Sequence, residues 1–186
     1  GFAQTNQWLC QYTPFDDDIN GTGYQTSSVA VIGPNRFVAL VTETPDPDTN
    51  LFNPPGNYLV GYWNADSANG RVPSPINGQQ TLPQYAATAQ YTSWSYILDQ
   101  VTFQGAWQMA GEPNGRVYVA NNDPSHNILV FELTAAGVTS TMYRMETGTQ
   151  NIWGIEVDTN GYVYVVDYRG NDTKTNEVKV YAGIDA

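Results

Sequence analysis

Oxygen-bearing side chains are densest at the start of the chain, in Asp16-Asp17-Asp18-Ile19-Asn20-Gly21. Calcium prefers several carboxylate and carbonyl oxygens from one loop, and a glycine permits the sharp turn that such a loop needs. The spacing differs from that of an EF-hand, and no glutamate follows at the required distance. Two interpretations stay open: a Ca²⁺ site with Asp16, Asp18 and Asn20 as ligands, or a solvated acidic loop.

A second candidate metal ligand is Asp167, which ends a predicted strand. Asn121 occupies the matching place 46 residues earlier, after the same Val-Tyr-Val run. Side chains at these strand ends would face a central channel if the sheets were arranged around one. Asp and Asn at a strand end also commonly cap turns, which is the alternative. The oxygen-rich loop 46–50 is interpreted as an exposed connection.

The sequence offers no recognisable catalytic set. His126 is the only histidine, and it lies in Asn-Asp-Pro-Ser-His-Asn, a predicted turn between strands. A Ser-His-Asp triad or a metal-dependent hydrolase usually needs a histidine held in place by its neighbours. No phosphate-binding loop, Gly-x-Ser-x-Gly turn or zinc-ligand spacing is found. The sequence therefore assigns no catalytic residue and favours a protein that is not an enzyme.

The composition narrows the range of partners. The 186 residues carry 18 acidic and 7 basic side chains, a net charge of −11. Nucleic-acid backbones require clustered lysine and arginine, and anionic lipid surfaces attract basic segments, so neither is an expected partner. No apolar run approaches the roughly 20 residues needed to span a bilayer. High tyrosine and threonine with few charged residues favours strands over helices.

Two stretches of the chain repeat one another, and this repeat predicts how the chain is organised. Residues 106–121 and 152–167 share Trp, Asn-Gly and Val-Tyr-Val at an offset of 46 residues, and each is followed by an alternating segment. A weaker copy spans 27–63. Alternation buries one face of each strand, and Asn-Gly favours a tight hairpin turn with positive φ. A period of 40 to 50 residues is typical of one four-stranded propeller blade.

The stretch from Trp153 to Asp167 resembles the NHL-type β-propeller repeat. In that repeat an apolar-Gly-Ile/Leu-Ala-Val-Asp strand turns at a glycine and returns as Val-Tyr-Val-Ala-Asp. The 106–133 copy is similar, with Gln108 in place of the glycine and Asn121 in place of the closing aspartate. The resemblance covers about half of the chain. It implies propeller architecture but leaves function open, because such propellers include binding scaffolds, lyases and lactone hydrolases.

The predicted fold is all-β and β-propeller-like, with antiparallel blades. Residues 1–26 form an N-terminal strand or cap, and blades occupy 27–186, at about 27–63, 101–133 and 152–182. The irregular part, 64–100, contains one more alternating segment at 91–98. Three to four blades are visible, whereas propellers have about four to eight. The prediction is therefore part of a larger propeller or one completed by a partner chain. Trp107 and Trp153 are expected to pack between blades.

The predicted function is a secreted or cell-surface module that binds proteins or assembles with copies of itself. Gly1 and Ala3 are spaced like the end of a secretory signal peptide, with the periplasm as an alternative location. The alternatives are a calcium-assisted propeller enzyme (a lactonase-like hydrolase or a lyase) and a carbohydrate-binding module. Cys10 is read as an inert residue, a lipid anchor or an intermolecular link. Asn20 and Asn171 begin glycosylation sequons.

Overall fold

The computed structural model describes residues 23–44, 57–63, 92–97, 108–121, 128–149, 152–167 and 177–184. Over these residues the chain is all-β, without a helix. The strands are β1 Gly23–Gly33, β2 Arg36–Thr44, β3 Asn57–Trp63, β4 Thr92–Ile97, β5 Met109–Gly111, β6 Arg116–Ala120, β7 Ile128–Thr134, β8 Gly137–Met145, β9 Ile152–Val157, β10 Tyr162–Asp167 and β11 Glu177–Ala182.

Within each sheet, strands that are consecutive in the sequence pair with one another, and all of these pairs are antiparallel. The described strands form three sheets, ordered β1-β2-β3-β4, β5-β6-β7-β8 and β9-β10-β11. The all-β antiparallel class predicted from the sequence is therefore confirmed. The strand predicted at 91–98 is present as β4, whereas β8 was not anticipated, because its Gly-Val-Thr-Ser-Thr run carries few large apolar residues.

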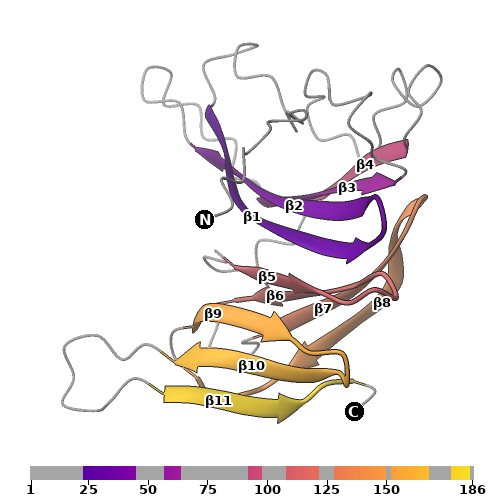
Figure 1. Ribbon diagram of the computed structural model, residues 1–186. Helices are drawn as coiled ribbons and strands as arrows, with labels where there is room; N and C mark the ends of the chain where they lie inside the picture. The colour runs from indigo at the N-terminus through magenta and orange to yellow at the C-terminus, as the bar shows by residue number, and fades with distance from the viewer. Residues whose placement is uncertain are drawn as a thin grey trace, which may run out of the picture.

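The three sheets lie on top of one another with the β5–β8 sheet in the middle (Figure 1). One apolar core fills the space between the first and middle sheets, and it includes Ile32, Leu40, Val117 and Phe131. A second core joins the opposite face of the middle sheet to the β9–β11 sheet. The middle sheet is consequently buried on both faces, and all five residues of β6 are buried.

The β5–β6 and β9–β10 hairpins use the same turn. In the first, Glu112 N donates to Arg116 O at 2.8 Å and Gly115 N donates to Glu112 O at 3.0 Å. Gly115 and Gly161 adopt φ of 96° and 82°, a region that glycine enters at little cost. Asn114 and Asn160 keep negative φ, so each loop is a type I turn followed by a left-handed glycine.

Candidate functional site

The hairpin turns lie along one edge of the stack, where they contact one another. Arg36, next to the β1–β2 turn, donates from Nη2 to the carbonyl oxygen of Pro113 in the β5–β6 turn at 3.3 Å. Between the second and third turns lies a shallow hollow of about 360 Å³. The described residues that line it are Glu112, Pro113, Asn114, Asp158, Thr159, Asn160 and Gly161.

Glu112 is the centre of a buried polar network on one wall of this hollow. Its Oε2 lies 3.4 Å from Arg116 Nη1, and its Oε1 accepts a hydrogen bond from the Tyr118 hydroxyl at 3.1 Å. Asn114 Nδ2 donates to Oε2 at 2.9 Å, and Arg116 also reaches Glu132 Oε1 at 3.2 Å. Burial is the main reason that the pKa of Tyr118 is raised above its usual value.

Asp158 takes the place of Glu112 in the next repeat, but its carboxylate is held differently. Its Oδ1 accepts from the backbone N–H groups of Asn160 and Tyr162, each at 2.9 Å. The Tyr164 hydroxyl donates to Oδ2 at 3.2 Å, as Tyr118 does to Glu112. These donors, led by the Tyr162 N–H, lower the pKa of Asp158, while the bond to Asp158 raises that of Tyr164.

The carboxylates that line the hollow therefore already make ion pairs or hydrogen bonds within the protein. Glu112 is paired with the Arg116 guanidinium, and Asp158 accepts hydrogen bonds from backbone N–H groups. A general base needs a lone pair directed at a substrate proton. In the described lining, these oxygens instead accept hydrogen bonds from groups of the same turns. The residues that line the hollow therefore stabilise the two turns and give them an acidic surface.

Asp167, the metal ligand predicted at a strand end, is buried at the end of β10. Its Oδ2 lies 2.7 Å from Lys179 Nζ on the neighbouring strand β11, so an ammonium group supplies the adjacent positive charge. Its repeat mate Asn121 is likewise buried. Among the residues described, no group of three or more His, Cys, Asp or Glu side chains could hold a metal ion. The metal role of Asp167 stays a prediction.

Several predicted features lie outside the described residues, and they stay predictions. These are the calcium loop with Asp16, Asp18 and Asn20, together with the loop 46–50, Cys10, Trp107, His126 and Asn171.

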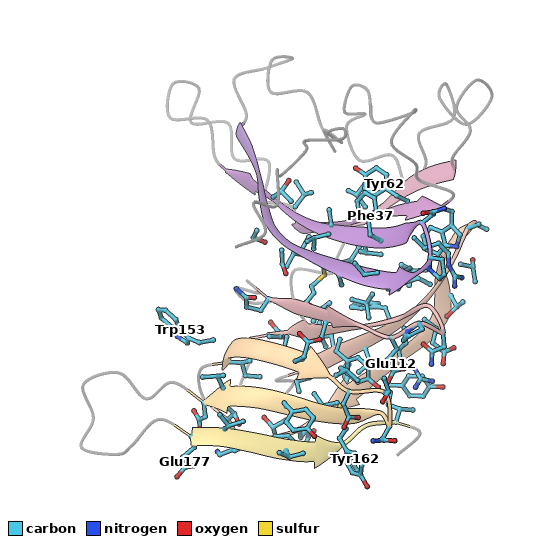
Figure 2. All side chains as sticks on the ribbon, in the orientation of Figure 1. Phe37, Tyr62, Glu112, Trp153, Tyr162 and Glu177 are labelled. Atoms are coloured by element: carbon cyan, nitrogen blue, oxygen red, sulfur yellow. The ribbon has the colours of Figure 1, made fainter. Side chains whose placement is uncertain are left out.

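The prediction that Trp153 packs between sheets is wrong. Its side chain is 65% exposed and points away from the sheets (Figure 2). The cause is a β-bulge: Ile152 pairs with Asp167 and Gly154 with Val166, which leaves Trp153 as the extra residue between them. The bulge takes Trp153 out of the regular alternation of side chains along β9.

One face of the β9–β11 sheet is apolar and exposed among the described residues. It is the face turned away from the middle sheet, it carries Val166, Val178 and Val180, and we call it the open face. Val178 and Val180 are 67% and 54% exposed, and Val166 is 39% exposed. Register places Val166 beside Val178 and Tyr164 beside Val180 on this face. Tyr162 projects from the same side of the stack (Figure 2).

Sequence reasoning overlooked both the open face and the Glu112 network. The alternation of 177–182 predicted a strand with one apolar set of side chains, but alternation alone does not say whether a second layer covers that set. Glu112 and Arg116 flank an Asn-Gly turn, and that spacing was the available signal for an ion pair across the hairpin.

No family model matches this chain, and no curated protein matches it either. Within the described ranges, no helix has the length and apolarity needed to cross a membrane.

Proposed function

We propose that this chain is a β-propeller-type scaffold, secreted or displayed at the cell surface, that acts by binding or assembling with proteins. The observation that carries the proposal is the open face, where valines and tyrosines of β10 and β11 meet solvent. Exposed contiguous apolar patches on folded proteins commonly mark interaction sites. Single exposed apolar residues need no such explanation, but Val166, Val178 and Val180 are neighbours on one sheet.

The stacking of the sheets supports the propeller part of the proposal. In the described residues β1, β5 and β9 contact one another in sequence order, so the first strands of the sheets share one side of the stack. Propeller blades likewise place their first strands around one axis. The likeness of the 153–167 hairpin to the NHL repeat points the same way.

Photocrosslinking in the cells that make the protein tests the scaffold function. A benzophenone amino acid replaces Val178 on the open face, and the matched control replaces Ala135, which is exposed in the β7–β8 turn. The proposal expects protein adducts from position 178 and few from position 135. Equal labelling from the two positions, or none from either, would contradict it.

A further inference from the structure

The β9–β11 sheet has one strand fewer than the other two sheets. The first and middle sheets each have four strands, and in both the fourth strand pairs with the third. Over the described residues the β9–β11 sheet has three, and β11 forms one edge of it, which we call the free edge (Figure 1). The repeat therefore shows what fits this edge, namely one more antiparallel strand in the position that β8 holds beside β7.

The backbone hydrogen bonds show which groups of β11 point to the free edge. Gly183 N donates to Gly161 O at 3.0 Å, and these two residues continue the register of β10 with β11. Along an antiparallel pair, residues that bond to the partner strand alternate with residues whose N–H and C=O groups point the other way. Lys179 therefore bonds to β10, whereas Val178 and Val180 direct their N–H and C=O groups to the free edge.

A tyrosine on β8 lies beside the same place. Tyr143 pairs with Val130 of β7, which belongs to the core shared with the β9–β11 sheet. Directly paired residues lie on one face of a sheet, so Tyr143 faces the β9–β11 side. Its neighbour on that face, Met145, packs against the core, but Tyr143 is 37% exposed. On the opposite face β8 contacts β4, the fourth strand of the first sheet. A fourth strand beside β11 would cover Tyr143 in the equivalent way.

We infer that the free edge of β11 binds an extended segment of a partner protein, which joins the sheet as a fourth, antiparallel strand. The inference rests on the proposed scaffold function and names the kind of segment that is bound. In such strand addition, main-chain hydrogen bonds give affinity and alternate side chains give specificity. The side chains that face the middle sheet cover Tyr143 and are therefore apolar. A basic residue opposite Glu177, which is exposed at the start of β11, completes the segment, and the net charge of −11 attracts it.

The β11 strand of a second copy of this chain fits the free edge less well than a lone segment. Each β11 has the middle sheet of its own copy stacked against one face. If two β11 strands paired, the middle sheet of the second copy would lie in the layer next to the free edge. The first copy's β8, with Tyr143, already occupies that layer. A lone extended segment brings no second layer and leaves β8 in place.

A synthetic peptide based on β8 is the probe. It has the sequence of residues 137–146 with two changes, Arg144→Leu and Glu146→Lys. If the peptide pairs with β11 as β8 pairs with β7, position 144 lies opposite Lys179 and position 146 opposite Glu177. Leucine avoids two cations in one cross-strand pair, and lysine gives Glu177 a partner of opposite charge.

Amide hydrogen exchange, followed by NMR on the whole chain, measures which N–H groups of β11 are bonded. In the chain alone, the amides of Val178 and Val180 should exchange at least about tenfold faster than the amide of Lys179. Saturating peptide should slow their exchange by about tenfold or more. Protection of Val178 and Val180 before the peptide is added would show that the edge is already paired, within the chain or with a second copy. Either that result or unchanged exchange with the peptide would overturn the inference.

Two N-methylated peptides form a matched pair of controls. In the register of β8 with β7, the N–H at the peptide's position 143 points to Val180, and the N–H at position 144 points away from β11. Methylation at position 143 should therefore weaken binding by at least about tenfold, and methylation at position 144 by less than about threefold. Equal losses would mean that the peptide does not bind as a strand on this edge.

A charge exchange tests the register. Glu177→Lys in the chain should weaken binding of the lysine peptide by about fivefold, and a peptide that keeps Glu146 should restore the affinity. Loss without restoration would contradict the pairing of Glu177 with position 146. If crosslinking from Val178 captures proteins while the peptide protects neither Val178 nor Val180, this inference fails and the scaffold function stands.

Discussion

The middle sheet and the β9–β11 sheet are built from the same repeat, yet their outward side chains have opposite surroundings. Tyr118 and Tyr164 occupy equivalent positions, as do Ile128 and Val178, and only the first of each pair is fully buried. The sheets differ in whether a further layer covers them, and the apolar pattern is the same in both. An apolar strand face therefore indicates that a layer belongs there, and in the part of the chain that the structure describes Val166, Val178 and Val180 lie exposed where that layer would be.

The β5–β6 and β9–β10 turns also differ in burial, and here the equivalent residues are polar. Glu112 is buried and holds Arg116, whereas Asp158 lies nearer solvent and is held by backbone N–H groups. Position 116 is arginine, and its mate at position 162 is the exposed Tyr162. A buried carboxylate requires a compensating charge, while a hydrated one is adequately served by hydrogen bonds. Substitutions at equivalent positions should therefore have large effects where the side chain is buried and small effects where it is hydrated.

Arg116→Leu is expected to lower the free energy of unfolding by about 4 kcal/mol, because it leaves the Glu112 carboxylate buried without its cation. The mate substitution Tyr162→Leu should change it by less than about 0.5 kcal/mol, since that side chain is exposed. Urea denaturation measures both. The double variant Glu112→Gln/Arg116→Leu should recover much of the loss, and no recovery would mean that Arg116 acts through packing alone.

Ile128→Ala should cost about 3 kcal/mol, because it opens a cavity in a core that is sealed on both sides. Val178→Ala, at the equivalent position of the open face, should cost less than about 0.5 kcal/mol in the monomer. Denaturation at protein concentrations low enough to keep the chain monomeric gives both numbers. Equal losses would mean that the open face is covered within a single chain.

Tyr118→Phe removes a buried donor to Glu112 and should cost about 1 kcal/mol at neutral pH. The folded state raises the pKa of Tyr118 above its ordinary value of 10.0, so the folded state holds this proton more tightly than the unfolded state does. The resulting stabilisation is complete below pH 10 and is lost as the pH rises through the folded pKa. The wild type should lose stability above pH 10 more steeply than the phenylalanine variant, as measured by alkaline denaturation.

Asp158→Asn should give the smallest effect, a loss of stability that is present at neutral pH and disappears in acid. The folded state lowers the pKa of Asp158 below its ordinary 3.8, so its contribution to stability is present above that value. That contribution is lost as the pH falls through the lower folded pKa. Acid unfolding followed by tryptophan fluorescence should therefore show a shallower transition below pH 3.8 in the asparagine variant. An unchanged acid limb would contradict the role given to the Tyr162 N–H.

The repeat allowed much of the local structure to be predicted. Asn-Gly placed the two turns, and alternation placed strands within 29–41, 57–63, 91–98, 152–167 and 177–182, because both signals depend on neighbours in sequence. The exposure of Trp153 could not be predicted, since a bulge shifts the register without changing the residue pattern. The ion pair of Asp167 with Lys179 joins strands across a loop, so it depends on a pairing that composition does not specify.

Thiol labelling at two equivalent positions tests most directly the central claim that one repeat face is open while its counterpart is closed. Val178→Cys and Ile128→Cys are each introduced into a chain carrying Cys10→Ser, and both are labelled at concentrations that keep the chain monomeric. The account predicts rapid labelling at position 178 and labelling at least about a hundredfold slower at position 128, where the core must first open. Similar rates at the two positions would contradict it.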